Sequence, residues 1–211
     1  MKRKLRYGVA VSLDGFIAGP RGEYDWIVQD SSIDFEAMYK QFDTVVMGRK
    51  TYETMLAQGG DGSIPGLDVI VFSRTMAPVT RPGIRVVNDD PGKTVAELKS
   101  RPGGDIWLFG GGDLCRSLLD AKLVDTIEIA VIPVVLTAGV PLVAPGSQAK
   151  LLLTDHRVLK STGIVVLSYA LSTSGGRAPR ITYVKSHKKR RRAPAKKVER
   201  SRAARSSRRS R

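Results

Sequence analysis

Apolar positions along the chain form short runs separated by loops rich in glycine, proline and charged residues. Runs of β-branched and aromatic residues predict strands, and apolar residues at helical spacing predict helices between them. The predicted strands are residues 5–11, 44–47, 68–72, 84–87, 106–109, 125–136, 151–158 and 164–171. The predicted helices are residues 34–42, 50–56 and 94–100, with a fourth that starts near residue 114.

Strands and helices alternate up to about residue 124, and only strands follow. Alternation is typical of a parallel sheet, because each parallel crossover needs a helix that packs on one face of the sheet. We therefore predict an α/β fold of three layers, α/β/α. Its mostly parallel central sheet has an antiparallel edge formed by the C-terminal strands.

Two segments near the N-terminus break this regular pattern. Residues 16–26 contain several glycines or prolines and no apolar period, which predicts a loop long enough to cover a site. The next predicted helix carries Phe35, Met38, Tyr39 and Phe42 at helical spacing, and we attribute these side chains to core packing.

The longest apolar stretch, residues 127–143, is not expected to cross a membrane. Glu128, Pro133, Gly139 and Pro141 interrupt it, whereas a spanning helix needs roughly 20 consecutive apolar residues. The apolar run behind the basic N-terminus is likewise broken by an acid within a few residues. We expect a buried strand with its exit loop, and no membrane contact.

Positive charge is concentrated at the C-terminal end of the chain. Residues 177–211 hold 16 Lys and Arg against one acid, Glu199, while the preceding residues hold 19 of each sign, so the net charge of +15 belongs to this end. A segment of this kind without apolar periodicity is not expected to fold. We predict a folded domain of residues 1–171, a linker of residues 172–187 and a disordered basic tail of residues 188–211.

Cysteine and histidine content excludes two kinds of site. A single cysteine, Cys115, rules out an internal disulfide, and with His156 the only histidine before residue 172, no Cys/His metal site is expected. This composition suits a reducing compartment, and we expect the cytoplasm. We interpret Cys115 as a thiol buried on a helix.

Two glycine corners, where a strand passes through glycine into a helix, carry the candidate chemistry. In residues 105–119 an apolar run meets Gly110, Gly111 and Gly112 before a helical pattern starts, and residues 44–51 repeat the arrangement with one glycine. Glycine lets the backbone approach a ligand closely, and the helix N-terminus that follows favours an anion such as phosphate. Packing alone explains a single corner equally well, but two corners can face one ligand.

Four motifs appear in an order and spacing that resemble the dihydrofolate reductase-like proteins. They are Val-Ser-Leu-Asp-Gly-Phe-Ile-Ala at 11–18, Val-Met-Gly-Arg-Lys-Thr-Tyr-Glu at 46–53, Ser73-Arg74, and Phe-Gly-Gly-Gly-Asp-Leu at 109–114. The resemblance covers about residues 4–171. It is closest to the C-terminal reductase domain of the bacterial bifunctional riboflavin-biosynthesis deaminase-reductase. No H-x-E and P-C-x-x-C deaminase signature precedes it, so we expect the stand-alone form.

The resemblance implies an NADPH-dependent reductase. Its reference substrate is 5-amino-6-(5-phosphoribosylamino)uracil, and dihydrofolate is the alternative. The two glycine corners would hold the pyrophosphate, Ser73 and Arg74 a 2′-phosphate, and Ala10 and Ile17 the nicotinamide, with a cis peptide at Gly110-Gly111. The implied cofactor residues are Ala10, Ile17, Gly48, Arg49, Lys50, Thr51, Ser73, Arg74, Phe109, Gly110, Gly111, Gly112, Asp113 and Leu114.

The proton donor is less clear, because the acids in the region that matches the dihydrofolate reductase carboxylate, Asp30 and Asp34, are out of register by a residue or two. Asp34 and Asp14 are the candidate catalytic groups, although Asp14 equally suits a turn with Gly15. The expected partners are a small-molecule substrate and, as one option, a second copy of the chain in a homodimer. A different class of function is a nucleic-acid-associated protein that binds non-specifically through residues 188–211.

Overall fold

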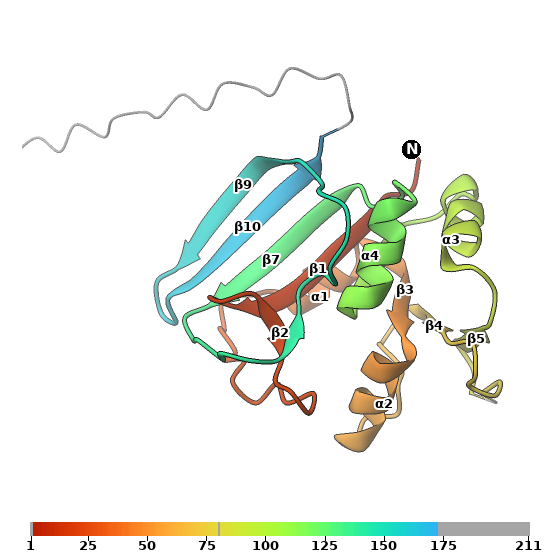
Figure 1. Ribbon diagram of the computed structural model, residues 1–211, viewed down its shortest axis with the longest axis horizontal. Coiled ribbons are helices and arrows are strands. Elements are labelled where there is room, and N and C mark those ends of the chain that lie inside the picture. Colours follow the sequence, from red (N-terminus) through yellow and green to blue (C-terminus); the bar gives the residue numbers. More distant parts are fainter. Residues whose placement is uncertain (1, 80, 173–211) are drawn as a thin grey trace, which may run out of the picture. The chain divides into compact units, whose positions relative to one another are not determined.

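A computed structural model describes residues 2–79 and 81–172 of the chain (Figure 1). The strands of its main sheet are β1 (Leu5–Ser12), β3 (Phe42–Gly48), β4 (Asp68–Phe72), β5 (Ile84–Val87), β6 (Asp105–Gly110), β7 (Thr126–Ile132), β9 (Leu151–Leu159) and β10 (Ile164–Leu171). They form one 8-stranded sheet in the order β5-β4-β3-β6-β1-β7-β10-β9. Neighbours from β5 to β7 are parallel, whereas β10 is antiparallel to both β7 and β9.

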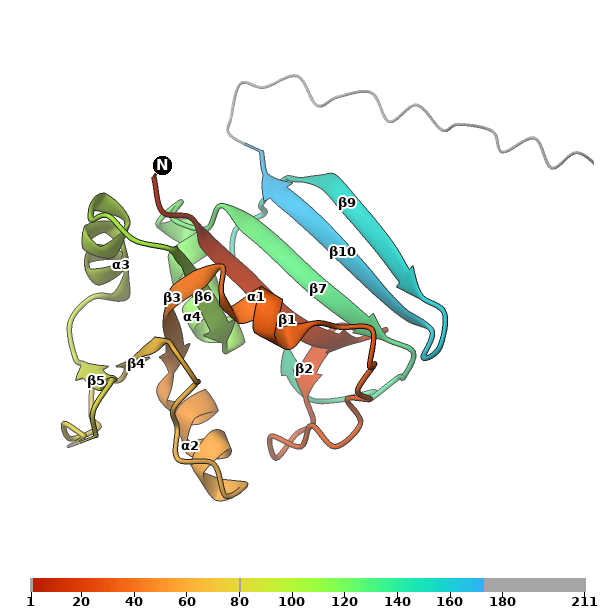
Figure 2. The ribbon, with the colours of Figure 1, turned by 180° about the vertical axis from the view of Figure 1, so that it is seen from behind.

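Helices cover both faces of this sheet. They are α1 (Phe35–Tyr39), α2 (Arg49–Ala57), α3 (Pro91–Ser100) and α4 (Gly112–Asp120). Helix α4 lies in front of the sheet in Figure 1, and α1 lies in front of it in the reverse view of Figure 2. Helix α3 packs in the same core cluster as α4. Alternation along β3 explains its apolar sequence, because Val46 packs in the core with α3 and α4 while Val45 and Met47 pack with α1 and α2. The predicted three-layer α/β fold with an antiparallel edge is therefore confirmed.

The first predicted helix is wrong at its C-terminal end. Helix α1 stops at Tyr39, and Phe42 is instead the first residue of β3, where it pairs with Asp105 of β6. Phe42 is buried against Trp107, as core packing requires, but Phe35 is 44% exposed and lines the cleft described below. Pairing between strands far apart in sequence took Phe42 from the helix, and the local pattern does not show this pairing.

The start of α3 also differs from the prediction. We expected the helix to begin near Thr94, but it begins at Pro91, because the Asp90 side chain accepts a hydrogen bond from the Lys93 N–H at 2.8 Å. Aspartate before proline is a favourable start for a helix, since proline suits the first helical position and lacks the N–H that would need a partner.

The predicted loop of residues 16–26 contains a short strand. Strand β2 (Phe16–Ala18) pairs with β8 (Val140–Pro141) in a separate two-stranded sheet. The sequence does not predict this pairing, because two or three residues are too few to show alternation. It ties the exit loop after β7 to the turn after β1, beside the cleft.

The last strand of the sheet, β10, ends at Leu171, where the predicted domain ends. The predicted linker beyond Ser172 and the predicted basic tail lie outside the described residues, and so does any contact of the tail with nucleic acid. In the described part of the chain, no helix is both long and apolar enough to cross a bilayer. The homodimer stays a prediction.

Candidate active site

A large cleft of about 2280 Å³ lies at the carboxyl ends of the parallel strands. Gly48, Ser73 and Gly110, which stand at or just beyond the ends of β3, β4 and β6, all line it. Open α/β sheets bind ligands at this edge. Drug-sized ligands occupy pockets of roughly 300–1,000 Å³, so this cleft has room for a dinucleotide and a second molecule together.

Two of the four helices start at the cleft with free N–H groups. Helix α2 has Gly48 as its N-cap and α4 has Gly111, and no side chain among the described residues caps either start. Helices α1 and α3 are capped by the carboxylates of Asp34 and Asp90 instead. The uncapped N–H groups and the positive end of the helix dipole are therefore available to an anion at the starts of α2 and α4.

Space around the glycines shows which of them protein packing requires. A Cβ on Gly111 would lie 3.6 Å from Thr51 Oγ1, and one on Gly48 would lie 3.9 Å from the Gly111 nitrogen, both ordinary contact distances. The φ angles of Gly111 and Gly48, −95° and −80°, suit any residue. Protein packing therefore does not require these two glycines, and the open space beside them fits a pyrophosphate.

Gly112 is different, because a Cβ there would lie 2.5 Å from the Pro141 carbonyl oxygen. The close approach of the chain after β8 requires this glycine. The Gly110-Gly111 peptide is cis, which confirms the expectation from the family resemblance. The two glycine corners adjoin, since the nearest neighbours of a Cβ on Gly48 belong to Gly110 and Gly111.

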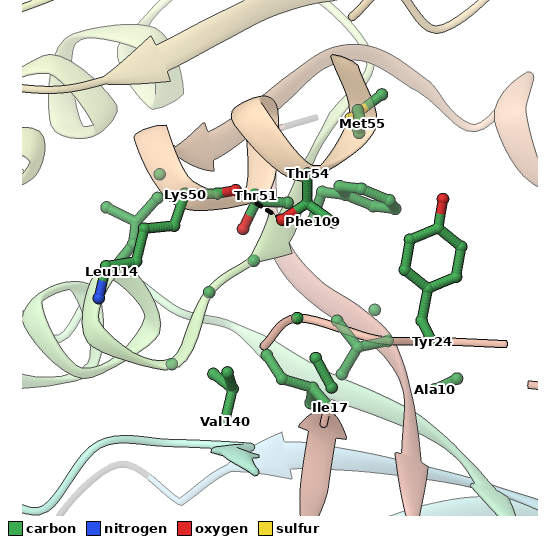
Figure 3. Close-up of a pocket in the computed structure, with 18 of the residues that line it drawn as sticks. Ala10, Ile17, Tyr24, Lys50, Thr51, Thr54, Met55, Phe109, Leu114 and Val140 are labelled. Carbon is green, nitrogen blue, oxygen red and sulfur yellow. Dashed lines mark hydrogen bonds between the residues drawn. The ribbon is translucent and has the colours of Figure 1, made fainter. Parts of the chain in front are cut away.

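Every residue that the resemblance assigns to the cofactor lines this one cleft. Figure 3 shows Lys50, Thr51 and Leu114 on the helical side of the cleft, with Ile17 and Val140 opposite them. Arg49 forms an ion pair of 2.7 Å with Glu53 one helical turn later. The structure thus brings together four motifs that are spread over a hundred residues of sequence.

Ser73 and Arg74 follow directly after β4 at the outer part of the cleft. The Met76 N–H donates to Ser73 Oγ at 3.0 Å, and Asn88 Nδ2 donates to the Ser73 carbonyl at 2.6 Å. Ser73 Oγ is the acceptor here, so its own proton can be donated to a ligand. Arg74 is exposed and forms no ion pair with any residue that the structure describes.

The structure places both candidate catalytic acids outside the residues that line the cleft. Asp14 accepts hydrogen bonds from Ser12 Oγ at 2.7 Å and from the backbone N–H groups of Leu136 and Thr137 at 3.1 and 2.7 Å. These bonds, led by the one from Ser12, lower the pKa of Asp14. Asp14 therefore joins the turn after β1 to the exit loop of β7. Asp34 accepts from the Ala37 N–H at 2.9 Å and caps α1.

Asp30, the other acid in that region, does line the cleft, but it is only 3% exposed. It accepts hydrogen bonds from the hydroxyls of Ser161, Ser32 and Thr162 at 2.5, 2.6 and 2.6 Å. These bonds, led by the one from Ser161, hold the pKa of Asp30 well below its usual range. A carboxylate that stays ionised is a poor proton donor. The hydrogen bonds from Ser161 and Thr162 instead give Asp30 a structural role, because they join the loop after β2 to the β9–β10 turn.

This anchor predicts a pH dependence of stability. Because the folded pKa of Asp30 is lower than the unfolded value of about 3.9, its contribution to stability is full above about pH 4 and declines as pH falls toward the folded pKa. Asp30→Asn should lower the melting temperature at neutral pH and reduce the further decrease of the melting temperature as pH is lowered. A series of thermal melts at different pH values would measure both effects. Asp155→Asn, on an exposed position of β9, is the control. Identical acid profiles for wild type and Asp30→Asn would contradict the anchor.

The other half of the cleft is aromatic and charged, and the sequence did not predict it. Arg6 of β1 donates to both carboxylate oxygens of Glu128 of β7, at 2.8 and 2.7 Å, and Glu128 lines the cleft. The hydrogen bond to Glu128 is the main reason that the pKa of Arg6 is raised. Tyr39 and Trp107 also line the cleft, with their rings tilted at 34° to each other and their centroids 5.7 Å apart. One signal was present, because Arg6 and Glu128 are charged positions inside otherwise apolar strands.

Cys115 takes no part in the cleft. It is fully buried on α4, and burial raises the pKa of its thiol to about 12. A thiol that stays protonated is unreactive, because the thiolate is the nucleophile. The interpretation of Cys115 as a buried helix residue is confirmed.

Comparison with protein families shows where this fold and cleft belong. The RibD C-terminal domain family model matches residues 3–167. The uncharacterised Bacillus subtilis (strain 168) protein YyaP is 32% identical over 179 residues, which cover 80% of this chain and 95% of YyaP. YwjB from the same organism is 32% identical over 145 residues, which cover 67% of this chain and 83% of YwjB.

Solved structures agree with this match. A protein from Shewanella sp. PV-4 described as a candidate riboflavin biosynthesis protein has a TM-score of 0.70 and 27% identity, and the match covers 81% of this chain and 99% of that one. Dihydrofolate reductase from Enterococcus faecalis, solved with NADP(H), has a TM-score of 0.62 at 17% identity, and the match covers 82% of this chain and 99% of that one.

A deaminase/5-amino-6-(5-phosphoribosylamino)uracil reductase from Thermotoga maritima has a TM-score of 0.62 at 15% identity, with 81% of this chain and 57% of that chain covered. The identities of this enzyme and of the Enterococcus enzyme are low enough that the likeness shows the fold alone. That fold is the dihydrofolate reductase-like fold which the motifs predict. Since the family match spans nearly all of the described residues, the chain belongs to the RibD C-terminal domain family of reductases.

Proposed function

We propose that the chain is an NADPH-dependent reductase that transfers a hydride to a small heterocyclic or phosphoribosylated substrate. The reaction would resemble that of 5-amino-6-(5-phosphoribosylamino)uracil reductase, with dihydrofolate as the alternative substrate. One observation carries the proposal: two uncapped helix starts, at Gly48 and Gly111, adjoin at one cleft. Two adjacent anion sites match the two phosphates of a dinucleotide.

Binding of the cofactor would use backbone groups more than side chains. The first N–H groups of α2 and α4 would donate to the pyrophosphate oxygens, and the Thr51 hydroxyl, which lies beside the space at Gly110 and Gly111, would add a further donor. When bound, the nicotinamide supplies the hydride. Ala10 and Ile17 line the inner cleft, where their apolar side chains would orient the ring and exclude water.

Arg74 predicts which nicotinamide cofactor is preferred. Its free guanidinium and the Ser73 hydroxyl suit a 2′-phosphate, which only NADPH carries. Arg74→Ala should weaken NADPH binding by about 1–3 kcal/mol, the range for a charge-assisted hydrogen bond, and hardly change NADH binding. Calorimetric titration of both cofactors measures the difference. Equal losses for the two cofactors would show that Arg74 supports the loop instead.

The proposed function is tested by following NADPH consumption with two substrates in parallel. Turnover of 5-amino-6-(5-phosphoribosylamino)uracil would support the riboflavin-type reaction, and turnover of dihydrofolate would support the alternative. A direct titration with NADPH separates cofactor binding from the choice of substrate. A chain that binds neither NADPH nor NADH would overturn the proposal.

A further inference from the structure

One row of residues crosses four neighbouring strands on the cleft side of the sheet. The register pairs Ala10 of β1 with Ala130 of β7, Ala130 with Val166 of β10, and Val166 with Arg157 of the edge strand β9. Directly paired residues in adjacent strands project to the same face of a sheet. All four residues line the cleft.

This row forms the floor of the cleft on these strands, with small or apolar side chains on β1, β7 and β10 and a cation on β9. Ala10, Ala130 and Val166 leave a shallow apolar surface, which suits a flat ring, and Ile33 packs against the same apolar cluster. Strands lie about 4.8 Å apart, so the Arg157 backbone stands about 14 Å along the sheet from Ala10. Arg157 therefore marks the end of the floor remote from the proposed nicotinamide position.

The charge of Arg157 is not neutralised by its neighbours. Within the described part of the chain Arg157 forms no ion pair. Glu128, an acid on the same face of the sheet, already accepts hydrogen bonds from two nitrogens of Arg6, Nε and Nη2. Asp155, two residues before Arg157, does not line the cleft. A planar guanidinium in this setting is suited to a carboxylate or a phosphate.

The backbone of the hairpin that carries Arg157 is anchored at its turn. The turn that follows β9 donates two hydrogen bonds, from Ser161 and Thr162, to the buried Asp30 carboxylate at 2.5 and 2.6 Å. This contact fixes the turn of the β9–β10 hairpin against the loop that follows β2. A binding group that is fixed in advance loses little freedom when its ligand arrives.

We propose that Arg157 is a specificity-determining residue that binds an oxyanion, phosphate or carboxylate, at the end of the substrate remote from the ring that accepts the hydride. This inference rests on the proposed function, because it places the nicotinamide at Ala10 and the substrate ring beside it, over Ala130 and Val166. It names the substrate class as a flat heterocycle that carries an anionic group at a distance.

The test uses Arg157→Gln in the full-length chain, with Lys160→Gln as the matched control. Lys160 is an exposed cation on the same hairpin and does not line the cleft. Calorimetric titrations with ribose 5-phosphate, folate and neutral ribose compare a phosphate, a carboxylate and an uncharged probe. NADPH affinity and melting temperature are measured for each variant, so a folding defect or a failed cofactor site is recognised separately.

The expected result is a loss of affinity of about 10- to 100-fold for a charged probe in Arg157→Gln, the range for one charge-assisted hydrogen-bonded contact. Lys160→Gln should bind that probe like wild type, and NADPH binding should be the same in all three chains. If only the affinity for ribose 5-phosphate depends on Arg157, the anionic group of the substrate is a phosphate. If only the affinity for folate depends on it, the group is a carboxylate. The proposal is overturned if neither charged probe binds wild type, or if Arg157→Gln binds both as tightly as wild type does.

Discussion

Gly111→Ala should abolish NADPH binding while the domain remains folded. The new Cβ would have no neighbour in the protein closer than Thr51 Oγ1 at 3.6 Å, and the φ of −95° is ordinary for alanine. It would, however, fill the space in front of the first N–H groups of α4. Loss of more than one charge-assisted hydrogen bond, each contributing about 1.5–3 kcal/mol, predicts a fall in affinity of about 100-fold or more.

Gly112→Ala is the matched control for this experiment. Its Cβ would lie 2.5 Å from the Pro141 carbonyl oxygen and 3.3 Å from the Ala144 nitrogen, so it should lower the free energy of unfolding by about 1–3 kcal/mol. NADPH titrations and thermal melts of both variants separate the two roles. Wild-type NADPH affinity in Gly111→Ala would remove the central argument for the cofactor site.

Trp107→Ala should give the largest loss of stability of any single substitution at the cleft. Trp107 is 7% exposed and its ring lies among those of Tyr39, Phe42 and Phe109, with centroids 4.9 to 5.8 Å away. Its indole N–H donates to the Gly8 carbonyl at 2.9 Å. Truncation would leave a cavity between the sheet and α1, and the expected loss in unfolding free energy is about 3–5 kcal/mol.

Trp107→Phe separates packing from hydrogen bonding at this position. Phenylalanine keeps most of the aromatic contacts but leaves the Gly8 carbonyl without its donor, which should lower the unfolding free energy by about 1 kcal/mol more than the lost contacts alone. Urea unfolding followed by circular dichroism measures both variants. If Trp107→Ala were as stable as wild type, the aromatic cluster would not be part of the folding core.

Elements that are determined by residues close together in the sequence were predictable from the sequence. The strand from Asp68 to Phe72 was predicted at its observed bounds, because a continuous β-branched run identifies a buried parallel strand without reference to its partners. The glycine corners were predictable for a similar reason, since a strand, a glycine and a helix start follow one another within a few residues. The order of residues along the chain was therefore sufficient to predict the half of the cleft that we propose for the cofactor.

The roles of the acids could not be predicted in the same way. Asp14 and Asp34 have the right chemistry for a proton donor, but the structure uses one to join two loops and the other to cap α1. A carboxylate accepts whichever donors the fold brings near it, and two of the donors to Asp14, the N–H groups of Leu136 and Thr137, lie more than a hundred residues away. Its sequence position alone does not distinguish a catalytic carboxylate from a structural one.

The proposed substrate half of the cleft depends entirely on pairing between distant strands. Ala10, Ala130, Val166 and Arg157 come from four segments, and the register that aligns them in one row is set by antiparallel pairing of β10 with β7 and β9. A shift of one residue in any pairing would turn the arginine to the opposite face of the sheet. The amino-acid sequence was thus sufficient for the layers, the family and the two glycine corners, which follow from local patterns. Which side chains meet at the substrate end follows from strand register, and register emerges only when the whole sheet is assembled.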